Sequence, residues 1–246
     1  MNINSMKYHI PSNILICLLV IITIITGCLD SDFEEQPTLF SLTLTLPDAG
    51  DWYETEAGDS LRILNFKMVI DSIEVMKQGL ENDIFEPDPR FVVLSTTGFM
   101  DESSIGTGGL TGGRYEGVEF TVAPPSMETQ IDDEHLVVRN EIGEVISTYS
   151  MAVIGIAQID GEVISFTFRS DVTERVLHGF MQPVEMPETM GTLQVQLRGL
   201  WHDWFIDPND YTRLLDPNDE ANRSHIEQSI IHQFEVVTSD VGGTIQ

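Results

Sequence analysis

One group of side chains in this 246-residue chain has the types and spacing of copper ligands. It comprises one imidazole and three thioethers, at His178, Met181, Met186 and Met190. Imidazole and thioether ligands together suit copper. Methionine also fills irregular gaps in a protein core, and a segment that contains two prolines needs apolar side chains to dock. Packing is therefore the default interpretation, with copper as the alternative.

A second group has the oxygen ligands that calcium prefers. The tetrapeptide Asp-Pro-Asn-Asp occurs at residues 207–210 and again at 216–219. Calcium takes six to eight oxygen ligands, and the repeat supplies four carboxylates, at Asp207, Asp210, Asp216 and Asp219. Aspartate before proline is also a common helix opening, with Asp as the N-cap and Pro at the first helical position. We favour capping, which predicts a short helix over 208–215 and a longer one from Pro217.

Other chemical constellations are weaker. The run Trp-His-Asp-Trp-Phe at 201–205 is read as the edge of a core, with a binding patch as the alternative. His225 and His232 share one face of the expected helix but have no third ligand. The sequence contains no Gly-x-Ser-x-Gly nucleophile motif. We assign no catalytic residue and do not expect an enzyme.

The segment before Cys28 indicates where the protein works. An uncharged apolar run begins near Ile14 and ends in Ile-Thr-Gly-Cys, after a single Lys7. This run has the length of a signal-peptide core rather than of a membrane-spanning helix. The small residues before Cys28 resemble the lipobox of bacterial lipoproteins. The resemblance implies a signal peptide at 1–27 and a lipid on Cys28, and two or more acyl chains hold a protein stably on a membrane.

The residues after Cys28 refine this localisation. Four of the next seven residues are acidic, which predicts a solvated tether over 28–37. An acidic stretch next to the lipidated cysteine resembles the surface-export tether of Bacteroidetes lipoproteins. That resemblance implies the outer membrane and favours the cell surface, with a periplasm-facing orientation as the alternative.

Composition excludes some partners and some means of stabilisation. The net charge is −28, and loss of Lys7 with the signal peptide makes it −29. A field of this sign repels nucleic acid, so no nucleic-acid partner is expected. The two cysteines are Cys17, within the signal peptide, and Cys28. No disulfide can then form in the mature chain, which must rely on an ordinary core.

Strand patterns dominate residues 38–246, which we interpret as one domain. The run 39–46 alternates apolar and hydroxyl side chains, as a half-buried strand does. Residues 61–76 alternate similarly, with a bulge or turn at Asp71. Asp160-Gly161 is typical of a hairpin with a type I′ turn. The glycine-rich residues 98–113 are expected to form a loop. The sequence thus predicts a mainly β fold, an antiparallel sandwich with a helical segment at about 208–234.

Several short stretches resemble the MbnP-like group of exported, copper-associated bacterial proteins. They are residues 64–75, residues 112–120 with their Gly-Arg-Tyr element before a strand, and the hairpin that ends at 166–169. The resemblance implies an immunoglobulin-like β-sandwich and metal handling. Residues 122–126 read Val-Ala-Pro-Pro-Ser, where the family has a glycine-valine-proline segment followed by asparagine. We therefore transfer no metal ligand from the family.

The leading hypothesis is a lipid-anchored, surface-exposed accessory subunit of an outer-membrane assembly. Without catalysis, it would bind a polymer or another protein, such as an outer-membrane or surface protein. Loops rich in Gly, Thr and acidic residues suit recognition, and an anchor suits a component that must stay at the cell. The alternative is a metal-binding lipoprotein that holds copper or calcium through the residues named above. No other cofactor is expected.

Overall fold

The computed structural model describes residues 37–79, 81–85, 91–95, 102–126 and 131–241. The chain divides into Met1–Gln36 and Pro37–Gln246, and the second unit holds every described residue. Cys28, the expected signal peptide and all but the last residue of the expected tether therefore lie outside the described residues.

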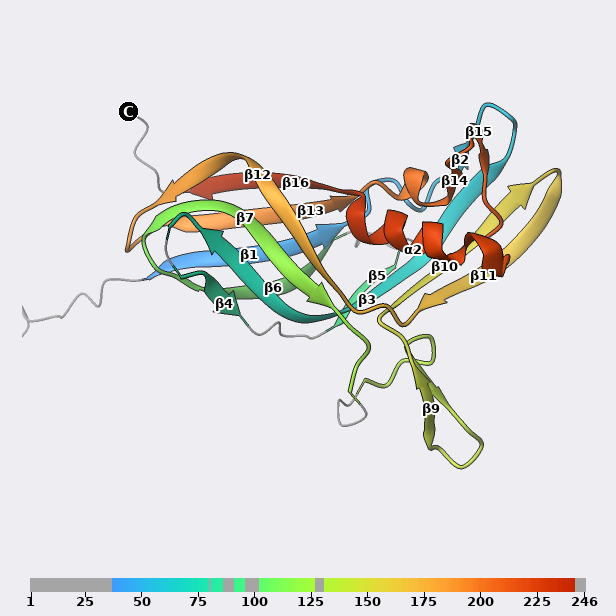
Figure 1. The fold of residues 1–246 in the computed structure, drawn as a ribbon, viewed down its shortest axis with the longest axis horizontal. Coiled ribbons are helices and arrows are strands. Elements are labelled where there is room, and N and C mark those ends of the chain that lie inside the picture. Colours follow the sequence, from blue (N-terminus) through green and yellow to red (C-terminus); the bar gives the residue numbers. More distant parts are fainter. Residues whose placement is uncertain (1–36, 80, 86–90, 96–101, 127–130, 242–246) are drawn as a thin grey trace, which may run out of the picture. The chain divides into compact units, whose positions relative to one another are not determined.

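Two β-sheets form the framework of the unit Pro37–Gln246 (Figure 1). The smaller sheet has the order β16-β13-β1-β6. Its strands are β1 (Thr38–Thr45), β6 (Glu102–Leu110), β13 (Thr192–Gly199) and β16 (Phe234–Val241). The larger sheet has eight strands, with the path β11-β10-β3-β7-β12 and three short strands, β2, β4 and β5, that pair with β3. Its strands are β2 (Tyr53–Glu54), β3 (Ser60–Lys77), β4 (Asp83–Phe85), β5 (Phe91–Ser95), β7 (Gly113–Val122), β10 (Met151–Ile159), β11 (Glu162–Ser170) and β12 (Glu174–Met186).

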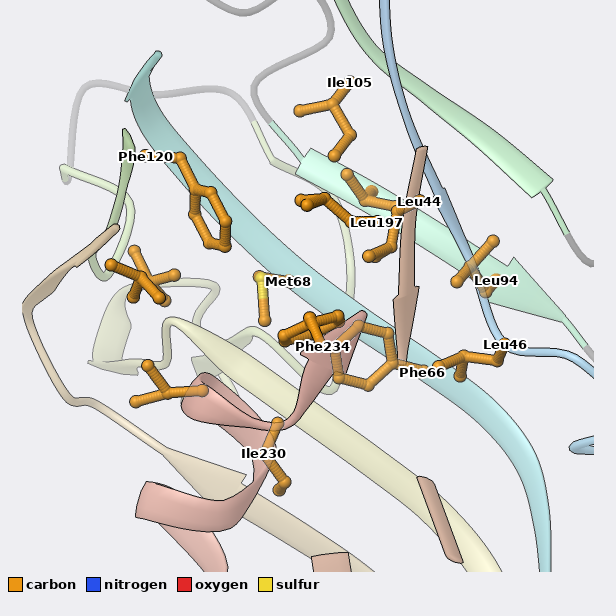
Figure 2. Close-up of a cluster of buried hydrophobic side chains, with 14 of the residues drawn as sticks. Leu44, Leu46, Phe66, Met68, Leu94, Ile105, Phe120, Leu197, Ile230 and Phe234 are labelled. Carbon is orange, nitrogen blue, oxygen red and sulfur yellow. The ribbon is translucent and has the colours of Figure 1, made fainter. Parts of the chain in front are cut away.

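Side chains from both sheets form one continuous hydrophobic core (Figure 2). The alternation in β1 buries Leu42, Leu44 and Leu46, as the pattern predicts, while Ser41 and Thr43 remain partly exposed. Phe66 and Met68 of β3 meet this layer from the larger sheet. The predicted β class and sandwich architecture are confirmed. One pairing differs from a purely antiparallel fold, because β1 runs parallel to β13.

The 18-residue strand β3 is the longest strand of the larger sheet and pairs with five other strands. It pairs with β10 through its first half and with β7 through its second half. The expected irregularity is present, since the β3–β7 register shifts between Ile70 and Ser72, where Asp71 is exposed. Residues 60–77 nevertheless form one continuous strand rather than two strands joined by a turn.

The expected glycine-rich loop is wrong for residues 102–110, which form strand β6 beside β1. The ring of Phe85 explains the glycine content at one position. A Cβ on Gly108 would lie 2.0 Å from Phe85 Cε1, so only glycine leaves room for this ring. The same ring stacks on Phe40, with centroids 5.3 Å apart. Gly108 is therefore required for packing against Phe85 and not for a turn.

The predicted helix over 208–215 is also wrong. The strands β14 (Ile206–Asp207) and β15 (Asp210–Leu214) form a hairpin across these residues. Two short 3₁₀ helices, η1 (Trp201–Phe205) and η2 (Glu220–Asn222), lie on either side of it in sequence. The longer predicted helix exists as α2 (Arg223–His232), which begins six residues later than expected and ends before Phe234. Its apolar residues Ile226, Ile230 and Ile231 are buried.

Candidate interaction hairpin

A two-stranded hairpin stands apart from the two main sheets (Figure 1). Its strands are β8 (Val137–Arg139) and β9 (Val145–Thr148), and they pair only with each other within the described residues. We call residues 136–149, which comprise these strands, their turn and one flanking residue on each side, the projecting hairpin. In the part of the chain that the structure describes, each of its strands has one unpaired edge, so its shape depends on its turn and its base.

The turn of the projecting hairpin is closed by a dense set of hydrogen bonds. Asn140 Oδ1 accepts from the amides of Ile142 and Glu144, at 3.1 and 2.9 Å. The backbone of Asn140 bonds to that of Glu144 and of Gly143 as well. Gly143 has a φ of +85°, which a residue with a side chain adopts only with strain. A short turn with glycine in the left-handed region is a common hairpin closure.

A buried group of charged and polar side chains fixes the base. Lys67 of β3 donates to Asp133 Oδ2 at 2.6 Å and contacts His135 Nδ1 at 3.1 Å. The side chains of Lys67 and Asp133 are only 8% and 14% exposed. Since an ammonium group only donates, Nδ1 of His135 accepts in this contact. Arg169 of β11 adds a bond from its Nε to the His135 carbonyl at 3.1 Å.

The electrostatics of Asp133 match this arrangement. Burial alone would raise the pKa of its carboxyl group, but bonds from Lys67 and from the His135 amide lower that pKa on balance. The carboxylate is therefore held in its charged form. A buried ion pair is costly to break, because the remaining partner becomes an uncompensated buried charge. The segment before β8 is thus tied firmly to the larger sheet.

Apolar packing supports the same base. Ile131, Leu136 and Val137 form a small cluster with Val69 of β3 and Ala152 of β10, separate from the main core. Leu136 is fully buried, and the Tyr149 amide donates to its carbonyl at 2.8 Å. The base is therefore held by both charge and apolar contact.

The outer part of the projecting hairpin exposes large apolar side chains. Ile142 in the turn is 79% exposed and Ile146 on β9 is 60% exposed. Glu141 and Glu144 lie on either side of Ile142 in the turn and are exposed. Apolar side chains on a preordered element can bind a partner with little further loss of conformational entropy. The arrangement suits contact with an apolar surface that has basic groups at its edge.

Sequence reasoning identified only residues 136–139 as a strand here and missed the hairpin. The signal was present in Asn140 and Gly143, since this spacing is typical of a closed hairpin turn. The buried contact between Lys67 and Asp133 joins residues 66 positions apart, and no local pattern marks it.

The four predicted copper ligands occupy different environments. Met186 is buried in the main core, whereas Met181 and Met190 are 95% and 78% exposed. His178 lies between two aromatic rings, with centroids 5.7 Å from Phe120 and 5.8 Å from Phe234. Burial lowers the pKa of His178, and the nearby His232 lowers it further. Copper binding by these four residues stays a prediction, and core packing accounts for Met186.

The predicted calcium ligands use their oxygens in local turns. Asp207 accepts from the Asn209 amide, and Asp216 accepts from the Asn218 amide, each at 2.8 Å. Asp210 accepts from the hydroxyl and amide of Thr212, which lowers the pKa of its carboxyl group. Asp219 caps η2 through the Ala221 amide. Among the described residues, no group of three or more His, Cys, Asp or Glu side chains is placed to hold a metal ion.

The aromatic run at 201–205 belongs to the core, as its default interpretation predicts. Trp201, Trp204 and Phe205 are buried, while His202 stacks on Tyr53 with centroids 5.4 Å apart. The two helical histidines serve different contacts. His225 lies 3.5 Å from the Ser229 hydroxyl, and His232 bonds to Glu174 of β12 at 2.9 Å.

Comparisons with known proteins give no functional assignment. No family model matches the chain, and no curated protein matches it. Among solved structures, MbnP from Methylosinus trichosporium matches at 9% identity with a TM-score of 0.41, covering 83% of this chain and 99% of that one. At that similarity we draw no functional argument from it. Over the described residues, no helix has the length and apolar character needed to cross a membrane.

Proposed function

We propose that this chain is a non-catalytic accessory protein of an outer-membrane assembly, held at the cell surface by a lipid on Cys28. In this proposal the projecting hairpin contacts a partner protein of the same assembly. One observation carries the proposal: exposed isoleucines stand on a hairpin whose base is fixed by the buried Lys67–Asp133 pair.

Contacts at the base of the projecting hairpin compensate for the low stability of a lone pair of strands. An isolated pair of strands with two free edges is marginally stable in water, and here a buried ion pair and a small apolar cluster hold it in place. Covering one isoleucine side chain stabilises a complex by roughly 1.5–3 kcal/mol. Glu141 and Glu144 would favour a partner whose apolar pocket has a basic rim.

Photo-crosslinking in the native membrane tests this contact. A photoreactive amino acid at Ile142 in the full-length chain should crosslink to one defined membrane protein. The same group at Val163, which is 68% exposed on β11, is the matched control and should not give that product. Crosslinking of both positions to the same mixture of proteins would contradict a specific role for the hairpin.

A pair of charge substitutions provides an independent check. Ile142→Asp with Ile146→Asp should abolish co-purification of the crosslinked protein in mild detergent, while Val163→Asp should leave co-purification intact.

Protease treatment of intact cells tests on which side of the outer membrane the domain lies. Cleavage in intact cells supports surface display, whereas protection until the outer membrane is opened would place the domain in the periplasm.

A further inference from the structure

A pocket of about 390 Å³ lies beside the segment that contains the first Asp-Pro-Asn-Asp copy. It is lined by η1, the β14–β15 hairpin, helix α2 and the residue that follows α2. Its lining residues are Asp203, Ile206, Pro208, Tyr211, His225 and Gln233. We call it the C-terminal pocket. Its volume lies within the roughly 300–1,000 Å³ range of small-molecule sites.

Asp203 distinguishes this pocket from the acidic turns around it. The carboxylates of Asp207, Asp210, Asp216 and Asp219 each accept a hydrogen bond from a backbone amide two residues ahead. The side chain of Asp203 has no hydrogen bond or ion pair with any described residue, although its backbone closes η1. Among the residues that the structure describes, it is also the only carboxylate that lines the pocket. Asp203 is exposed, so the pocket presents one solvent-accessible negative charge that no described side chain neutralises.

The remaining lining groups favour a cation with an apolar body. Tyr211 is 77% exposed and offers an aromatic ring, and aromatic faces attract organic cations. Ile206 and Pro208 add apolar surface, and Gln233 adds an amide. The net charge of −28 raises the local concentration of cations near any such site.

A divalent metal ion fits the pocket poorly. One carboxylate and one imidazole line it, whereas divalent metal ions take four to eight ligands in proteins. From these observations we propose that the C-terminal pocket binds a small organic ammonium ion, with the charged nitrogen beside Asp203 and its alkyl groups against Tyr211. This proposal does not depend on the projecting hairpin.

Calorimetric titration of the full-length protein in detergent tests the site with two probes of the same shape. Choline carries the positive nitrogen, and 3,3-dimethylbutan-1-ol replaces that nitrogen with carbon. Because the positive charge is what distinguishes the two probes and Asp203 attracts it, choline should bind at least about fivefold more tightly than the alcohol. Asp203→Asn should remove that preference, and Tyr211→Ala should weaken choline binding several-fold.

Asp219→Asn is the matched control, because it removes one exposed carboxylate from the same segment outside the pocket and keeps a capping side chain. It should leave choline binding unchanged. Equal binding of the two probes, an equal loss in Asp219→Asn, or no heat from wild type at millimolar choline would overturn the proposal. Far-UV circular dichroism shows whether each variant is folded. If Asp203→Asn is unfolded, the loss of choline binding in Tyr211→Ala decides the result.

Discussion

Two glycines that lie opposite each other on neighbouring strands of the larger sheet should respond very differently to substitution by alanine. Gly117 of β7 and Gly179 of β12 are directly paired. A Cβ on Gly117 would lie 2.6 Å from the His178 carbonyl oxygen and 3.2 Å from the Cα of Gly179. A Cβ on Gly179 would have its nearest neighbour, the Glu116 carbonyl oxygen, at 3.9 Å. The first contact requires backbone to move, while the second is ordinary.

Gly117→Ala should therefore lower the free energy of unfolding by about 1–3 kcal/mol, the usual cost of overpacking. For a domain of about 200 residues, each kcal/mol corresponds to roughly 2–4 °C in melting temperature. We expect a decrease of about 2–12 °C for Gly117→Ala, measured by circular dichroism. Gly179→Ala should stay within about 0.5 kcal/mol of wild type, as surface substitutions usually do. Equal melting temperatures for the two variants, or a larger loss in Gly179→Ala, would refute this reasoning.

Three further predictions concern charge and anchoring. Lys67→Met should lower the free energy of unfolding by about 3–5 kcal/mol, because Asp133 is left as a buried charge without its ion-pair partner. The double variant Lys67→Met with Asp133→Asn should recover part of that stability, as measured by urea titration. The folded pKa of His178 lies below its unfolded value near 6.5, so the unfolded chain binds more protons and stability should fall as pH drops below that value. His178→Phe should flatten this dependence between pH 7 and 5, and an unchanged slope would mean that other groups cause it. Cys28→Ser should remove the lipid from the mature protein by mass spectrometry and shift it from the membrane to the soluble fraction, whereas a lipid that persists would contradict attachment at Cys28.

The parts of the fold that sequence reasoning predicted are those in which a local pattern has one physical solution. The alternation in β1 can bury Leu42 and Leu44 only as a strand. Asp160 and Gly161 have φ values of +52° and +82°, which agrees with the predicted type I′ turn between β10 and β11.

The errors come from residues whose local pattern suits more than one structure. Asp207 accepts from the amide two residues later, a contact that serves a hairpin turn as well as a helix start. Gly108 lacks a side chain because Phe85 lies against it, and that requirement comes from another strand. The anchoring contact of Lys67 likewise depends on an acid far along the chain. Contacts of this kind can be recognised only in the tertiary structure.

The parallel pairing of β1 with β13 has a consequence for the order in which the protein folds. Leu39 pairs with Thr192, and β13 in turn pairs with β16 near the other end of the chain. Closing so long a loop carries an entropic cost, and folds dominated by distant pairings form slowly. One edge of β1, the first strand after the expected tether, therefore stays unpaired until β13 has been synthesised. Until then this edge is open to wrong partners, so a chaperone that shields residues 38–45 would increase the yield of folded protein.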